Sequence, residues 1–125
     1  MNPFLPRLCG GLNAAFVAFH LLLFPMIQHL PVPGEVRALM HAFNVGGLLM
    51  IGFLAFAFLL CRNDLGTRLG RGAIVLGALV YLTRAAGEFA FFPAPNPVIA
   101  VACLLVGVLH LAVLCGTLKR ACASA

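Results

Sequence analysis

Charged side chains are scarce in this chain. Only 9% of its 125 residues are charged, with eight lysines and arginines against three acidic residues, whereas 63% are hydrophobic. A typical soluble domain has about 25% charged residues, so this chain has too few polar side chains to cover a water-soluble globule. The composition therefore excludes a soluble protein and predicts one that is embedded in a lipid bilayer.

Sequence motifs of soluble enzymes are also missing. The chain has no glycine-rich phosphate loop, no HExxH zinc motif and no GxSxG nucleophile elbow. It has no two carboxylates spaced for acid and base catalysis either. The sequence does not predict an enzyme, because a membrane enzyme acting on a lipid or quinone would have only Glu88 and the histidines to support it.

Paired cysteines are absent, since the five cysteines include no CxxC pair and no spacing typical of a metal site. Cys103 lies within an apolar stretch without a partner at its depth. The other four fall near the predicted cytoplasmic ends, where thiols are kept reduced; these are Cys9, Cys61, Cys115 and Cys122. The pattern predicts neither a disulfide nor a lipid anchor, and we expect the cysteines to serve as small apolar filler.

Alternating strand patterns are absent too, and the apolar residues form four long blocks instead. A hydrocarbon core of about 30 Å needs about 20 helical residues, and lipid cannot satisfy an exposed backbone, so each block predicts a transmembrane helix. The predicted spans are residues 9–30, 38–61, 69–92 and 98–118. The predicted fold is all-α, an integral membrane four-helix bundle with up-down-up-down order and a single transmembrane domain over 1–125.

Proline-rich and polar segments separate the four blocks. PVPGE at 31–35 and PAPNP at 93–97 predict tight turns, because proline lacks the backbone N–H that continues a helix. RNDLGTRLGR at 62–71 predicts a polar loop between two helical hairpins. HLPVPG lacks a small-residue cleavage pattern, so the first block is interpreted as a retained span rather than a signal peptide.

The positive charges predict the orientation in the membrane. Six cations lie at the two termini or in the middle loop, and an even number of crossings places these on one side; they are Arg7, Arg62, Arg68, Arg71, Lys119 and Arg120. Arg37 is alone on the other side. Cytoplasmic loops collect arginine and lysine, so we expect an inner-membrane protein with both termini cytoplasmic. Because the cations flank the spans, no nucleic-acid partner is predicted.

Polar residues inside the spans are the candidate functional residues, because a charge at membrane depth is costly unless it is paired or hydrated. Tyr81, Arg84 and Glu88 recur at spacings of three and four, which places them on one stripe of the third span. Arg84 and Glu88 are i,i+4 neighbours and predict an ion pair within one helix. A guanidinium has five N–H donors, so further partners are expected from neighbouring helices.

Histidines and asparagines on the other spans are the expected partners. His41 and Asn44 begin the second span, while His20 and His110 lie near the middle of the first and fourth. If these faces converge, they form a buried polar site in the outer half of the bundle, with glycines allowing close helix approach. His29 falls on the opposite face from His20 and is interpreted as a wetted boundary residue.

Three functions are consistent with such a site. The first is an accessory or ligand-binding membrane subunit, with Arg84, Glu88, His41, Asn44 and Tyr81 as ligand-binding or proton-relay candidates. The second is an electron-transfer protein in which His20 and His110 bind haem b, or in which a histidine and Glu88 hold a metal whose identity the sequence leaves open. The third is a small proton-coupled transporter acting as a homo-oligomer. The lipid bilayer, and for the first function a larger membrane complex, are the predicted partners.

Overall fold

Four long helices make up the protein. The computed structural model describes residues 4–123, so residues 1–3 and 124–125 of the predicted single domain lie outside the described part. The helices are α1 (Phe4–Gln28), α2 (Gly34–Leu59), α3 (Arg68–Phe91) and α4 (Pro97–Ala123). Each is long and apolar enough to cross a membrane. The predicted all-α, four-helix membrane fold is therefore confirmed.

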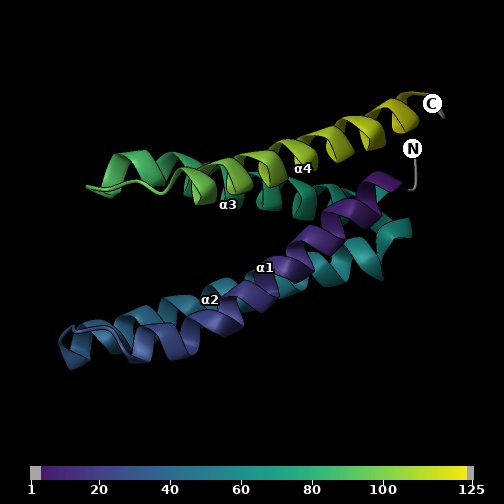
Figure 1. The fold of residues 1–125 in the computed structure, drawn as a ribbon. Coiled ribbons are helices and arrows are strands. Elements are labelled where there is room, and N and C mark those ends of the chain that lie inside the picture. The colour runs from purple at the N-terminus through teal and green to yellow at the C-terminus, as the bar shows by residue number, and fades with distance from the viewer. Residues whose placement is uncertain (1–3, 124–125) are drawn as a thin grey trace.

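The helices form two antiparallel hairpins, one of α1 with α2 and one of α3 with α4 (Figure 1). The start of α1 and the end of α4 lie together at one end of the molecule, called here the terminal end. The two proline-containing turns, at 29–33 and 92–96, define the opposite or turn end. This up-down-up-down course follows from short connections, which leave consecutive helices side by side.

The second hairpin turns sharply because its sequence ends one helix and starts the next. Pro97 occupies the first position of α4, where its missing N–H costs no helical hydrogen bond. The Asn96 side-chain oxygen accepts hydrogen bonds from the backbone N–H groups of Val98 at 3.0 Å and Ile99 at 3.4 Å. Asn96 is thus the N-cap of α4.

Arg37 holds the turn of the first hairpin. Its guanidinium donates to the backbone carbonyls of Leu30 at 3.0 Å and Val32 at 3.2 Å. These carbonyls follow the end of α1, where no further helical turn can accept from them. Arg37 therefore has a local role in closing the α1–α2 turn.

The middle loop is more ordered than its polar sequence predicts. It forms a short 3₁₀ helix, η1 (Arg62–Gly66), and its Leu65 is buried against the core. Thr67 then caps α3, because its side-chain oxygen accepts from the Gly70 backbone N–H at 3.0 Å. The loop thus packs the terminal ends of the two hairpins against each other.

Packing is dense toward the terminal end and sparse toward the turn end. One apolar core cluster joins Cys9, Phe58, Leu65, Ile74 and Val113, which come from both hairpins and the loop. By contrast, α1 has no buried residue between positions 14 and 26, and α2 has only Asn44 buried before position 51. The two hairpins accordingly diverge toward the turn end (Figure 1).

Candidate functional site

A buried polar cluster lies where the two hairpins meet. We call it the junction cluster, and it consists of Cys9 and Asn13 from α1, Tyr81 from α3 and His110 from α4. Each of these side chains is at most 2% exposed. Phe58 of α2 packs edge-on against the His110 ring at 4.9 Å between centroids, so all four helices contribute to the site.

Two backbone carbonyls fix the direction of the hydrogen bonds in the cluster. The Cys9 carbonyl can only accept, so the group at 2.8 Å from it is the Asn13 amide nitrogen. The Asn13 oxygen is then free to accept from the Tyr81 hydroxyl, at 2.9 Å. This hydrogen bond joins α1 to α3 and therefore the first hairpin to the second.

The same reasoning assigns the protons of His110. Its Nδ1 lies 2.8 Å from the Val106 carbonyl oxygen and must donate to it, so Nδ1 carries the proton. Nε2 then has the lone pair that accepts from the Asn13 amide, at 3.5 Å. The Cys9 sulfur lies 3.3 Å from Nδ1 against the ring. His110 is thus a neutral imidazole whose polar atoms have partners within the protein.

Gly77 makes room for the His110 ring. A Cβ atom at Gly77 would lie 2.3 Å from Cδ2 and 2.4 Å from Nε2 of the imidazole. Those distances are far inside van der Waals contact, so only glycine allows the ring to lie on the backbone of α3. The α3–α4 packing and the position of the histidine depend on each other.

The first hairpin repeats this packing at another depth. A Cβ atom at Gly47 of α2 would lie 2.8 Å from Nε2 of His20 on α1. The Asn44 amide donates to the backbone carbonyl of His20 at 3.0 Å. However, Nδ1 of His20 and the side-chain oxygen of Asn44 are buried without a hydrogen-bond partner among residues 4–123. This part of the hairpin has unused polar atoms, unlike the junction cluster.

His41 lies nearer the turn end of the same hairpin. Its Nε2 donates to the side-chain oxygen of Gln28 at 3.3 Å, and its ring stacks on Phe24 with 5.7 Å between centroids. Both partners come from the last turns of α1. His41 therefore connects the two helices of the first hairpin and has no described contact with the second.

Arg84 and Glu88 form the ion pair that their spacing predicts. The other carboxylate oxygen of Glu88 accepts from the backbone N–H of Asn96, at 2.8 Å, in the turn that follows α3. The guanidinium also lies over the Phe92 ring, 5.2 Å from its centroid, in cation–π geometry. The further partners of the pair are thus a backbone amide and an aromatic ring of its own hairpin, and no imidazole.

Burial differs sharply between these two charged side chains. The Glu88 side chain is 4% exposed, whereas that of Arg84 is 40% exposed. Glu88 spans the inside of the hairpin turn, and Arg84 lies on its surface with N–H groups that no described residue accepts from. Both oxygens of the carboxylate therefore have hydrogen-bond partners, whereas part of the guanidinium is exposed.

The candidate residues named from the sequence thus fall into three groups. Tyr81 and His110 belong to the junction cluster, His20, Asn44 and His41 lie within the first hairpin, and Arg84 with Glu88 lies within the second. A buried polar site exists, but it contains histidine, asparagine, cysteine and tyrosine and lies between mid-depth and the terminal end. The expected site of arginine, glutamate and histidine in the outer half does not form as one cluster.

Cys9 is the member that sequence reasoning did not select, whereas the sequence does place Asn13 on the polar face that it shares with His20. Cys9 was expected to be apolar filler, and it instead contacts an imidazole and an amide. Their spacing of four residues, continued at His20 seven residues further, places all three on one face of the helix. That stripe was the available signal, although it does not reveal which helix the face meets.

No metal-binding cluster is found in the described part of the chain: among residues 4–123, no three histidine, cysteine or acidic side chains lie close enough to hold a metal ion.

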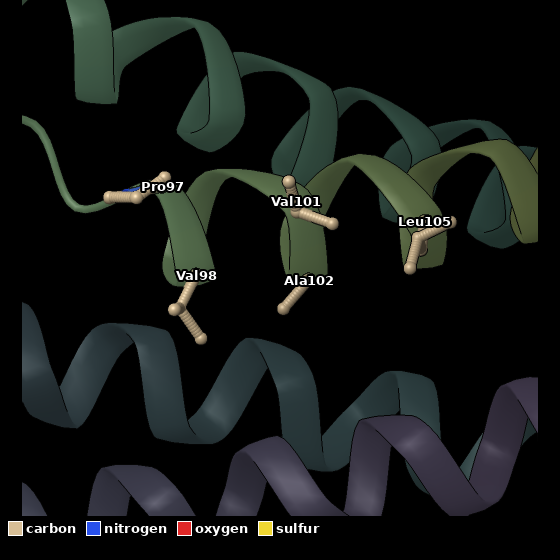
Figure 2. A pocket seen from close by; sticks show the side chains of 5 residues that line it. All are labelled: Pro97, Val98, Val101, Ala102 and Leu105. Carbon is tan, nitrogen blue, oxygen red and sulfur yellow. The ribbon is translucent and has the colours of Figure 1, made fainter.

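An apolar pocket lies on α4. It measures about 470 Å³ and is lined by the first turns of α4, at Pro97, Val98, Val101, Ala102 and Leu105. Figure 2 shows Val98 and Ala102 pointing from α4 toward the first hairpin.

Comparisons of the chain with protein-family models, with curated proteins and with solved structures find no match.

Proposed function

We propose that this protein is an accessory, ligand-binding subunit of the inner membrane that holds an apolar molecule between its two hairpins. The observation that carries the proposal is the contrast between the two ends of the bundle. The junction cluster joins the hairpins with internally satisfied polar groups. Beyond it, the first turns of α4 line an open apolar pocket, and Val98 and Ala102 point from it toward the first hairpin.

The pocket has the size and chemistry for a membrane-soluble ligand. Its volume is about 470 Å³, and it is an open groove along one helix, so a bound molecule would remain in contact with the surrounding lipid. All five lining residues are apolar, so the bound part of the molecule must also be apolar. A molecule of that kind reaches the site through the bilayer, which contacts the exposed apolar faces of the helices.

The orientation and partners belong to the same proposal. The charge bias supports cytoplasmic termini, with the pocket open toward the opposite side of the membrane. Large apolar side chains are exposed on all four helices, including Leu22, Phe53, Leu79 and Leu111. These surfaces are suited to lipid, and also to the helices of a larger membrane complex.

Haem binding and transport have less support from the geometry. His20 and His110 belong to different hairpins, and each ring lies on a glycine of its own hairpin. Bis-imidazole ligation of haem b would require both rings to leave those positions. Proton transport would route through Glu88, whose two oxygens are occupied by Arg84 and the Asn96 backbone. The ligand-binding function requires no such rearrangement.

Photolabelling tests the proposal. The purified full-length protein in lipid nanodiscs is irradiated with an alkane that carries a diazirine and no oxygen, and the labelled residues are identified by mass spectrometry. We expect saturable labelling of residues 97–105. Ala102→Trp, which fills the pocket, should reduce that labelling about tenfold or more because the probe loses its space.

Val108→Trp is the matched control. Val108 is an exposed residue of α4 that lies outside the pocket, so the same bulky substitution there should leave labelling of residues 97–105 unchanged. Non-saturable labelling spread evenly over all exposed apolar residues would show that the probe detects only bulk lipid contact, and the proposal would then be rejected.

A further inference from the structure

Positive side chains gather at the terminal end of the second hairpin. Arg68 lies nine residues before Gly77 on α3, and Lys119 lies nine residues after His110 on α4. The two antiparallel helices touch at that glycine and that histidine. At 1.5 Å per residue, Arg68 and Lys119 therefore lie at the same level, about 14 Å beyond the contact.

The loop before α3 holds a further arginine in place. Arg62 begins η1, whose Leu65 is buried in the core, and Thr67 then caps α3. Arg62 and Arg68 therefore extend from a fixed backbone, which reduces the conformational entropy lost when a partner binds. Asp64 is the one acidic side chain of this loop, so cations outnumber carboxylates here.

These cations differ from those nearer the turn end in their partners. Arg37 donates to two backbone carbonyls, and Arg84 has a carboxylate partner. By contrast, Arg62, Arg68 and Lys119 are exposed, and nothing in the described part of the chain forms a hydrogen bond or an ion pair with their side chains. Their charge can therefore attract an anion outside the protein.

An exposed stripe runs from each helical cation toward the middle of the bundle. Each stripe has four exposed residues at spacings of four, three and four, which place them on one face of a helix. On α3 they are Arg68, Gly72, Val75 and Leu79. On α4 they are Lys119, Cys115, Ala112 and Val108. Apart from the cation, neither stripe has a charged residue.

The level of the cations selects the class of partner. At 24 residues, α3 is about 36 Å long, which exceeds a hydrocarbon core of about 30 Å, so its first residue, Arg68, lies at the level of the lipid headgroups. A soluble anion would contact the cations and leave the apolar stripes uncovered. A zwitterionic headgroup brings its own cation, which these side chains repel. An anionic phospholipid matches both the charge and the stripe below it.

We propose that the terminal end of the second hairpin binds anionic phospholipids, whose phosphates contact Arg62, Arg68 and Lys119 and whose acyl chains lie along the two exposed stripes. This surface is separate from the α4 pocket, and the inference does not depend on the ligand proposed for that pocket. Cations that served only to direct insertion would leave the folded protein in equal contact with anionic and zwitterionic lipids. The two roles therefore differ in a measurable way.

Quenching by brominated lipids tests this inference. The chain has no tryptophan, so a single introduced one reports the lipid beside it. Val75→Trp lies seven residues from the start of α3, at the terminal end, and Leu104→Trp lies seven residues from the start of α4, at the turn end. The two native side chains are similarly exposed, at 40% and 48%.

The full chain is reconstituted in vesicles of phosphatidylcholine and phosphatidylglycerol in which one lipid or the other carries bromine in its acyl chain. We expect quenching of Val75→Trp to show about fivefold enrichment of phosphatidylglycerol, as one cation at the membrane surface implies. Quenching of Leu104→Trp should follow the bulk lipid composition.

Substitutions at the cations separate charge from structure. In the Val75→Trp background, Arg62→Gln, Arg68→Gln and Lys119→Gln together should abolish the enrichment. Arg62→Lys with Arg68→Lys should retain most of it, because the charge is kept. Salt gives a second measurement with every cation in place: the enrichment should fall several-fold between about 0.01 M and about 1 M ionic strength, as the Debye length falls from about 30 Å to about 3 Å.

Several results would overturn the proposal. These are no enrichment at Val75→Trp, equal enrichment at both reporters, enrichment that survives removal of the three cations, and enrichment that is independent of salt. Loss of the enrichment in millimolar inorganic phosphate at constant ionic strength would assign the cations to a soluble anion and would also overturn it.

Discussion

The terminal half and the turn half of this bundle differ in how their polar side chains obtain hydrogen-bond partners. At the terminal end, polar groups from α1, α3 and α4 satisfy one another across the two hairpins. Toward the turn end, polar groups find partners only within their own hairpin, and some have no partner among residues 4–123. The comparison teaches that interhairpin hydrogen bonds accompany close packing, whereas the diverging half keeps buried polar atoms that have no hydrogen-bond partner among residues 4–123.

The largest loss of unfolding free energy is expected from a substitution at Gly77, in the terminal half. Gly77→Ala places a methyl group against the buried His110 ring, and such overpacking costs about 2 to 3 kcal/mol of unfolding free energy. Stability can be followed by the reaction of buried Cys9 and Cys103 with a fluorogenic maleimide during heating, in a background where Cys61, Cys115 and Cys122 are alanine.

Gly72→Ala is the control for Gly77. Its Cβ would meet no atom within 4 Å, so the substitution should leave the unfolding temperature unchanged or raise it slightly. Equal losses in the two variants would mean that helix propensity, and not the His110 contact, determines the result.

One asparagine in each half allows the stability losses of the two halves to be compared. Asn13→Leu leaves the buried Tyr81 hydroxyl and His110 Nε2 without partners and should cost about 2 kcal/mol. Asn44→Leu removes a single hydrogen bond to the His20 carbonyl, for which about 0.6 kcal/mol is typical in membrane proteins. The same thiol-reactivity assay compares them, and an equal or larger loss for Asn44 would contradict the difference between the halves.

Substitution of Glu88 tests whether the turn of the second hairpin is stabilised by contacts within that hairpin. Glu88→Leu removes the acceptor of the Asn96 backbone N–H and leaves Arg84 without its counter-ion, for an expected loss of about 1.5 kcal/mol. Glu88→Gln keeps an oxygen for Asn96 and should recover part of that loss. Hydrogen exchange measured by mass spectrometry should locate the change at residues 92–99, and a change spread over α1 and α2 would contradict this assignment.

Within the terminal half, the smallest effect is expected at the start of α3. Thr67→Ala removes the side-chain oxygen that caps Gly70 and should cost about 1 kcal/mol or less. Thr67→Ser retains the oxygen and should restore stability in the same melting experiment. A loss as large as that of Asn13→Leu would mean that the loop contributes as much to the terminal half as the junction cluster does.

The number of the helices could be predicted from the sequence because bilayer thickness sets the length of an apolar block that spans it. Blocks of about 20 apolar residues separated by proline turns leave few alternatives. The Arg84–Glu88 pair was also predictable, since an i,i+4 contact depends on one helix alone. The cap at Asn96, which precedes Pro97, carries a local signal of the same kind.

The membership of the buried site could not be predicted in the same way. Helical periodicity gives the polar face of each span, but the meeting of two faces depends on the rotation and divergence of the hairpins. His20 and Asn13 share one face of α1, yet only Asn13 lies where the hairpins are in contact. Cys9 enters the cluster through its contact with His110, a residue 101 positions away.

The division of hydrogen bonds between the hairpins also implies an order of assembly. Arg37 closes the first turn and Glu88 with Asn96 closes the second, using only residues of the same hairpin. Each helical pair can therefore enter the bilayer as a self-sufficient unit. Asn13 and Tyr81 belong to different pairs, so we expect their hydrogen bond to form only once both pairs are inserted.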